Sequence, residues 1–206
     1  MTFLSPQPAV FLNRNATLVK DVRPIDETHQ IRFVPGVLEA LRLLHRIGFA
    51  LIVMTGDERK AHYRRRPEPD DIAHIAHMER ILRSTFAEAS IPLQGFYHCS
   101  DHSNAAEPSN TVRCLCRKPK PGVLVRASKD LYIDMKSSWM VGDSLDDIEA
   151  GRWAGCRSVL IHGHETEWNL TESRWPDFIA STLLEAAQLI VLTNPSWVST
   201  HSPNFG

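Results

Sequence analysis

The sequence predicts an α/β fold built on a doubly wound parallel sheet, and two observations support that prediction. Short apolar runs, which suit strands buried on both faces, alternate along the chain with segments whose apolar residues recur at helical spacing. Polar residues able to bind ligands directly follow several of the apolar runs. Because ligands of such sheets bind beyond the carboxyl ends of the strands, the sequence also predicts where a site would lie.

The first elements show both patterns. Residues 9–12 (Ala-Val-Phe-Leu) form an apolar run typical of a short buried strand, and residues 49–54 (Phe-Ala-Leu-Ile-Val-Met) form a second one. Between them lies a predicted helix that ends at Gly48, a residue suited to a C-terminal cap. Its apolar positions recur at helical spacing: Val37, Leu38, Leu41, Leu44 and Ile47.

The alternation continues along the rest of the chain. Further strands are expected at 95–98, 138–141, 158–161 and 177–179. Further helices are expected at 71–89, 121–130, 146–154 and 182–191. These elements indicate one domain over residues 1–192, followed by an Asn/Pro/Ser-rich tail at 193–206 that we expect to be flexible.

The composition limits the classes of partner. A chain of 206 residues suits a single domain with a substantial core, and its formal net charge of −1 gives no electrostatic case for nucleic acid. No apolar run approaches the roughly 20 residues that span a bilayer. The start of the chain (Met-Thr-Phe-Leu-Ser-Pro) lacks the basic and apolar regions of a signal peptide. We therefore expect a cytoplasmic protein that binds neither nucleic acid nor membrane.

Five polar residues are predicted to converge on one site. Asn13, Asn15, Thr55 and Asp143 each come just after an expected strand, and Lys118 lies at the start of an expected helix. Turn preferences alone would explain any one of them, because Asp, Asn and Thr are common in strand-to-helix loops. Their joint occurrence in this order favours a shared site at the carboxyl edge of the sheet.

Two segments resemble signature loops of haloacid dehalogenase (HAD) phosphatases. They are residues 114–122 (Cys-Leu-Cys-Arg-Lys-Pro-Lys-Pro-Gly) and residues 140–147 (Met-Val-Gly-Asp-Ser-Leu-Asp-Asp). Together with residues 133–135 (Ile-Asp-Met), they resemble the D,D-heptose 1,7-bisphosphate phosphatases and the related histidinol-phosphate phosphatases most closely. The resemblance covers the chain from Ala9 to about Val191 and implies a HAD-like, Rossmann-like fold with a small zinc loop and no large cap domain.

The resemblance also implies a role for each site residue. In such enzymes a first Asp attacks phosphorus and a second Asp, two residues later, is the general acid; these positions correspond to Asn13 and Asn15. Mg²⁺ would be held at position 13, by the main-chain carbonyl at position 15, and by Asp143. Thr55, Arg117 and Lys118 would bind the phosphorylated sugar, with Lys118 neutralising phosphate charge. Asp146 or Asp147 would steady Lys118 or a metal-bound water.

The first motif departs from the family pattern in three linked ways. Both expected carboxylates are amides, and Ala16 stands where the family has Gly. An amide oxygen is a far weaker nucleophile and metal ligand than a carboxylate, so we expect weakened or absent Mg²⁺ binding and little turnover. Phosphate affinity need not fall, because two negative charges are missing while Lys118 remains. The loop at 56–60 (Gly-Asp-Glu-Arg-Lys) also differs from the family, which leaves the sugar unassigned.

A cysteine-rich loop at about 98–117 is predicted to bind structural zinc. Cys99, Cys114 and Cys116 cluster in a chain without a secretion signal, which favours a metal over disulfides. The fourth ligand is predicted to be His102, because thiolate-rich zinc more often takes imidazole; Asp101, which aligns with the family's His, is the alternative. Four protein ligands leave no position for water, so the zinc would stabilise the loop that presents Lys118.

Two functions remain open at this level. The first is a sugar-phosphate phosphatase with altered catalytic residues, and the second is a non-catalytic phosphosugar-binding or regulatory protein. A scaffold for another sugar-pathway enzyme is compatible with the second. Elsewhere, Cys156 is expected to be buried and Trp139 to pack in the core. Basic residues between Arg59 and Arg66 suit either a solvated loop or a second phosphate contact.

Overall fold

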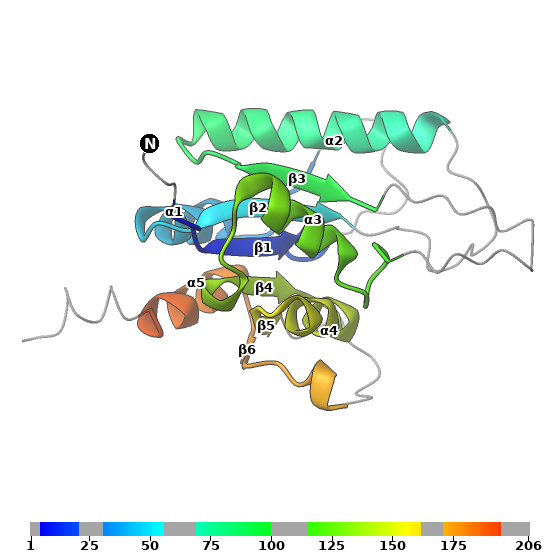
Figure 1. Ribbon diagram of the computed structural model, residues 1–206. Coiled ribbons are helices and arrows are strands. Elements are labelled where there is room, and N and C mark those ends of the chain that lie inside the picture. The colour runs from blue at the N-terminus through cyan, green and yellow to red at the C-terminus, as the bar shows by residue number, and fades with distance from the viewer. Residues whose placement is uncertain (1–4, 21–30, 56–68, 100–114, 162–170, 195–206) are drawn as a thin grey trace, which may run out of the picture.

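The protein is built around a parallel sheet with helices on both faces (Figure 1). The computed structural model describes residues 5–20, 31–55, 69–99, 115–161 and 171–194. Within these residues the sheet has six strands: β1 (Ala9–Asn13), β2 (Ala50–Thr55), β3 (Gly95–His98), β4 (Trp139–Gly142), β5 (Arg157–Ile161) and β6 (Phe178–Ala180). The doubly wound α/β fold expected from the sequence is therefore confirmed.

The strand order creates a natural ligand site beside β1. The order is β3-β2-β1-β4-β5-β6, so the chain winds outward first on one side of β1 and then on the other. All five strand pairs are parallel, and each brings its carboxyl end to the same edge of the sheet. In open sheets of this kind ligands bind where the winding reverses, which here is between β1 and β4. Asn13 ends the first of these strands, and Asp143 directly follows the second.

Alternate residues of the strands face two separate apolar layers. Val10 and Leu12 pack with helices α1 (Val37–Arg46), α2 (Pro69–Glu88) and α5 (Leu183–Leu192). Ala9 and Phe11 pack on the opposite face with helices α3 (Gly122–Leu131) and α4 (Leu145–Ala154). Both layers are buried, which explains why the strands are apolar throughout instead of alternating with polar residues.

The expected elements agree with the structure to within one or two residues at most ends. Gly48 and Gly155 have left-handed backbone angles, with φ of 94° and 90°. They lie just after the C-terminal ends of α1 and α4, as expected. Short 3₁₀ turns add η1 (Met135–Ser137) and η2 (Glu172–Arg174), which the periodicity did not predict. Trp139 and Cys156 are buried, as expected.

Several expected features lie outside the described residues. These are the basic loop after Thr55, the central part of the zinc loop with Asp101, His102 and Cys114, and most of the tail after residue 194. No helix in the parts that are described combines the length and the apolar character needed to cross a membrane.

Candidate functional site

The carboxyl end of β1 runs into a tight hydrogen-bonded turn. Ala16 N donates to Val19 O over 2.8 Å, and Val19 N donates to Arg14 O over 3.1 Å. Ala16 has φ of 56°, in the left-handed region that costs an L-residue about 1 kcal/mol and that glycine adopts freely. Ala16 therefore has the backbone conformation that suits a glycine, although it carries a Cβ. Asn13, the last residue of β1, lies at the carboxyl edge of the sheet, directly before this turn.

Asn13 joins two other segments of the chain through its side-chain amide. Lys118 Nζ donates to Asn13 Oδ1 over 3.0 Å, and Asn13 Nδ2 donates to Asp143 Oδ1 over 2.6 Å. Asn13 Nδ2 also lies 3.4 Å from the main-chain oxygen of Asn15. These residues come from the end of β1, the loop before α3 and the end of β4, so the predicted convergence is confirmed for Asn13, Lys118 and Asp143.

Lys118 forms an ion pair with the first turn of α4. Its Nζ lies 2.5 Å from Asp147 Oδ1, and the Asp147 side chain is only 1% exposed. Ser144 caps α4: its hydroxyl accepts from the backbone N–H of Asp147 over 3.3 Å and donates to Asp147 Oδ2 over 2.9 Å. Gly142 permits this packing, because a Cβ there would lie 2.4 Å from Asp147 Cβ. Of the two acids considered for steadying Lys118, the structure selects Asp147.

The other predicted site residues occupy different environments. Thr55 is buried at the end of β2, directly beside β1, where Asn13 pairs in register with Met54. Asn15 Oδ1 accepts from the buried Arg14 guanidinium over 2.8 Å, so the Asn15 side chain is held by its neighbour. The Arg117 side chain is exposed to solvent. Asn13, Asp143, Lys118 and Thr55 thus line the edge, with Arg117 toward its outer side.

The electrostatics of this cluster raise the pKa of Asp143. Burial is the largest cause, and the nearby Asp147 carboxylate is the next; both raise the pKa of Asp143 above its ordinary value. The hydrogen bond from Asn13 and the charge of Lys118 act in the opposite direction without cancelling the first two. The cluster therefore contains negative charge that its own residues do not fully compensate, as is common in binding and catalytic sites.

Comparison with known proteins assigns this geometry to a family. A family model described as HAD-hydrolase-like matches residues 115–186. The chain is 34% identical over 147 residues to the D-glycero-β-D-manno-heptose-1,7-bisphosphate 7-phosphatase of Photorhabdus laumondii, covering 71% of this chain and 76% of that protein. It is also 34% identical to the Escherichia coli K12 enzyme of the same name over 69% of this chain and 72% of that one. The chain belongs to the HAD-like heptose-bisphosphate phosphatase family.

Solved structures agree with this HAD-like assignment. The D,D-heptose 1,7-bisphosphate phosphatase of B. bronchiseptica superposes with a TM-score of 0.70 at 20% identity, covering 91% of this chain and 99% of that one. At that identity the likeness shows the shared fold alone. That structure was solved with magnesium and phosphate.

Magnesium does not fit the Asn13 side chain as it is oriented here. From the sequence, an oxygen at position 13 was expected to be a weak cation ligand, but it is the Nδ2 group of Asn13 that faces Asp143. The same Nδ2 group lies against the main-chain oxygen of Asn15, which was the third expected ligand. An N–H donor cannot coordinate a cation. Within the described residues, no cluster of three or more His, Cys, Asp or Glu side chains is arranged to hold a metal ion.

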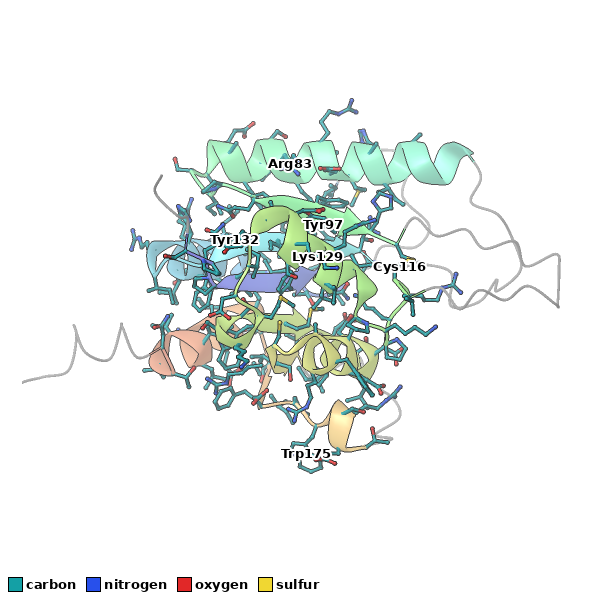
Figure 2. All side chains as sticks on the ribbon, in the orientation of Figure 1. Arg83, Tyr97, Cys116, Lys129, Tyr132 and Trp175 are labelled. Atoms are coloured by element: carbon teal, nitrogen blue, oxygen red, sulfur yellow. A yellow bond between two sulfur atoms is a disulfide. The ribbon has the colours of Figure 1, made fainter. Side chains whose placement is uncertain are left out.

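The cysteine loop is joined differently from the sequence-based expectation. Cys99 and Cys116 form a disulfide, with Cα atoms 5.3 Å apart, whereas their clustering favoured a metal. Their proximity has a simple cause, because Cys99 follows β3 and Cys116 precedes the loop that leads into α3, which packs near that strand. Figure 2 shows Cys116 near the end of the sheet toward which the strands point. Cys114 and His102 lie outside the described residues.

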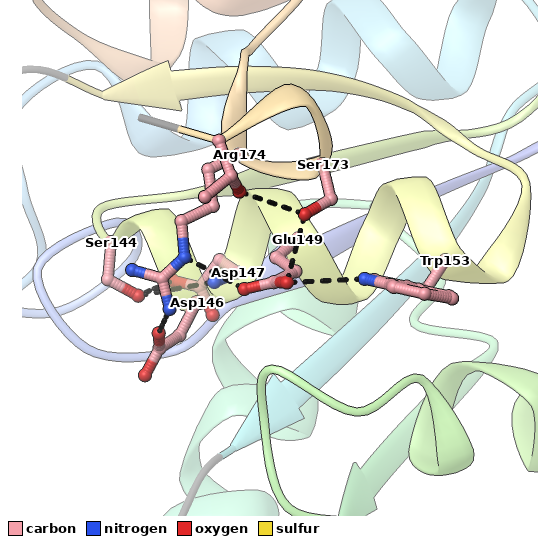
Figure 3. A network of polar contacts seen from close by, with 8 residues as sticks. Ser144, Asp146, Asp147, Glu149, Trp153, Ser173 and Arg174 are labelled. Carbon is pink, nitrogen blue, oxygen red and sulfur yellow. Dashed lines mark hydrogen bonds and ion pairs between the residues drawn. The ribbon is translucent and has the colours of Figure 1, made fainter. Parts of the chain in front are cut away.

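A second polar network, on the outer side of α4, was not found by sequence reasoning (Figure 3). Arg174 of η2 donates to Glu149 Oε2 over 2.8 Å and to Asp146 Oδ1 over 2.9 Å. Ser173 and Trp153 also donate to Glu149. Asp146 is therefore bound to Arg174 and is not a partner of Lys118. The i, i+3 spacing of Asp146 and Glu149 was the one sequence signal, since it places both acids on one helix face.

Proposed function

We propose that this member of the HAD-like family binds a phosphorylated sugar and hydrolyses it at a rate near background. One observation carries the proposal: Asn13 stands where the family resemblance implies a nucleophilic carboxylate, and its amide bonds to both Lys118 and Asp143. A neutral amide oxygen that already accepts from a lysine is a very poor nucleophile. Asn15 cannot supply a proton in place of the implied general acid, because an amide does not titrate in water.

Phosphate binding is supported by the donors that remain at the edge of the sheet. The Lys118 ammonium has three N–H groups, and within the described residues its contacts are with Asn13 and Asp147. Its side chain is 15% exposed, and the two contacts leave one N–H of the ammonium for a ligand. Replacing two acids by amides also removes charge that would repel a phosphate dianion. A heptose bisphosphate is the first substrate to test, because the relatives named above act on it.

A slow but genuine phosphatase is the second candidate, and family membership favours it. Relatives at 34% identity are named as 7-phosphatases of D-glycero-β-D-manno-heptose 1,7-bisphosphate. Such activity would require a nucleophile other than the side chain at position 13, for example a water molecule activated by Asp143. The two candidates therefore differ in a measurable way, namely whether an aspartyl-phosphate can form.

Phosphate release from a panel of sugar mono- and bisphosphates separates the two. We expect the natural chain to stay near background and Asn13→Asp to show limited activity. Asn13→Asp with Asn15→Asp should exceed the single variant by about 10²-fold or more, the range of general acid catalysis. Mass spectrometry of the assayed protein checks that Asn13 is intact. Robust magnesium-dependent turnover by protein with intact Asn13 would refute the non-catalytic function.

Direct binding measurements complete that test. Calorimetric titration of the natural chain with a sugar bisphosphate should detect a complex, and inorganic phosphate should bind more weakly at the same site. Lys118→Arg is the matched variant, since it keeps the positive charge but not the compact ammonium. Absence of binding by every member of the panel would contradict the phosphosugar-binding function.

We also propose that the reduced protein, without the Cys99–Cys116 disulfide, holds a structural zinc through Cys99, Cys114, Cys116 and either His102 or Asp101. The closeness of the Cys99 and Cys116 sulfur atoms supports this, because zinc thiolates and a disulfide both need them adjacent. Elemental analysis after metal-replete expression should find about one zinc per chain, as a four-ligand site requires.

A thiol count on the same protein distinguishes zinc from the disulfide. Denatured, chelator-treated protein should have four reactive thiols if zinc was bound, because the chain has four cysteines. The Cys99–Cys116 disulfide would hide two of them. Cys114→Ser should lose the metal and destabilise the fold, since zinc-binding energy is also folding energy. Cys156→Ser is the control, because the buried Cys156 lies outside the zinc loop.

A further inference from the structure

The orientation of the Asn13 amide is determined by its two charged neighbours. Lys118 can only donate, so the atom 3.0 Å from its ammonium must be the amide oxygen. The amide nitrogen then faces Asp143 Oδ1 at 2.6 Å. Rotating the amide by half a turn would bring its NH₂ group against the Lys118 ammonium. It would also bring the amide oxygen to the short distance from Asp143 Oδ1 that the amide nitrogen now has. Neither arrangement is tolerable, so the amide is held in one orientation.

This orientation directs both N–H groups of Asn13 at oxygens that could otherwise bind a cation. One faces the carboxylate of Asp143, and the other faces the main-chain oxygen of Asn15 at 3.4 Å. A divalent cation shared by these two oxygens would lie where Nδ2 is. We propose that the Asn13 amide nitrogen replaces the divalent cation, so that the site excludes Mg²⁺ and similar ions. This deepens the proposed function, because a site of this kind would bind phosphate without a metal.

The charge balance of the cluster supports the same conclusion. One lysine and two aspartates leave Asn13, Lys118, Asp143 and Asp147 with a formal charge of −1, and Lys118 is already paired with Asp147. A carboxylate at position 13 would add a second uncompensated charge directly beside Asp143, which a divalent cation would neutralise. The amide removes that charge and donates a hydrogen bond in its place. The site then has a satisfied donor where the family resemblance implies a metal ion.

Titration with Mn²⁺, followed by electron paramagnetic resonance, tests the proposal without any phosphate present. Asn13→Asp should bind Mn²⁺ at least about tenfold more tightly than the natural chain, a difference of about 1.4 kcal/mol. Asn13→Ala is the decisive variant. If the amide blocks the site, its removal leaves Mn²⁺ affinity equal or higher. If Asn13 is instead a weak ligand through its oxygen, Asn13→Ala binds less tightly than the natural chain, and the proposal is wrong.

Two controls keep the result tied to this site. Asn13→Asp combined with Asp143→Asn should lose the gained Mn²⁺ binding, whereas binding elsewhere in the chain would persist and overturn the assignment. Circular dichroism checks that each variant is folded, and Asn13→Ser replaces Asn13→Ala should the latter unfold. An Asn13→Asp variant that binds no better than the natural chain would also refute the proposal. Because no phosphate is used, these outcomes are independent of whether the protein binds a phosphosugar.

Discussion

Helix α4 carries two polar clusters at neighbouring residues, and they differ in how well their charges are compensated. Asp147 faces the sheet edge, where it pairs with Lys118 and is 1% exposed. Asp146 faces outward to Arg174 and is 35% exposed. Each cluster contains one basic residue and two acids. The inner cluster is formed by Lys118, Asp143 and Asp147, and the outer cluster by Arg174, Asp146 and Glu149.

The two clusters shift the pKa of an acid in opposite directions. Burial alone would raise the pKa of Glu149, but hydrogen bonds from Ser173, Trp153 and Arg174 hold it below its ordinary value. Burial and the charge of Asp147 raise the pKa of Asp143, and its hydrogen bond from Asn13 does not offset them. The donors of the outer cluster thus outweigh burial at Glu149, whereas those of the inner cluster do not outweigh burial and like charge at Asp143. This difference agrees with a structural role for the outer cluster and with the ligand site proposed at the inner one.

The largest effect is expected from Lys118→Met. The substitution removes the ion-pair partner of a nearly fully buried carboxylate and the donor to Asn13. Removing one partner of a buried ion pair typically lowers the free energy of unfolding by about 3–5 kcal/mol. Because Lys118 is partly exposed and water can reach its position, we expect a loss near the lower value. Urea unfolding at pH 7 in EDTA would measure the loss. A change below about 1 kcal/mol would mean that the inner cluster is as solvated as the outer one.

A smaller effect with a characteristic pH dependence is expected from Asp143→Asn. Because the folded-state pKa of Asp143 is raised, the stability it contributes is present below its unfolded-state pKa. That stability is lost as the pH rises through the folded-state value. The variant lacks this loss, so it should be more stable than the natural chain at pH 7. Unfolding free energies measured from acid to neutral pH, in EDTA, should show the advantage growing with pH. A constant or shrinking advantage would contradict the electrostatic account of the inner cluster.

The smallest effect is expected from Arg174→Met, the matched control for Lys118→Met. Both variants remove a cation that contacts two side chains, but Arg174 is 25% exposed and its partners are reached by solvent. Ion pairs of this kind contribute about 0.2–1 kcal/mol each. The same urea series should therefore show a loss of about 1 kcal/mol. A loss equal to that of Lys118→Met would remove the distinction between the clusters.

The sequence was sufficient to predict which segments form the inner cluster. Apolar strands that end at Asn13 and just before Asp143 predict that these two residues share the sheet edge, because parallel strands align their carboxyl ends. Lys118 was identified through its place at the start of a helix and through its motif. These features are local, so they can be read from short stretches of sequence.

Features that depend on non-local contacts could not be predicted in the same way. Asp146 and Asp147 are adjacent acids on one helix, and only the packing of α4 against β4 and η2 decides which faces Lys118. The orientation of the Asn13 amide depends on Lys118, which is 105 residues away. The Cys99–Cys116 contact depends on how α3 and the segment before it pack against β3. The strand order follows from crossover connections that the order of elements does not specify.

The left-handed backbone at Ala16 affects which substitutions this site can accept. The turn keeps this shape with an alanine, because main-chain bonds between Ala16 and Val19 and between Arg14 and Val19 define it. This loop has glycine-like angles at position 16 and tolerates a Cβ there. On a mutational path, Asn13, Asn15 and Ala16 are therefore separable steps, each reversible without rebuilding the main chain. A carboxylate introduced at position 13 or 15 would therefore enter a main chain that already has the shape of this turn.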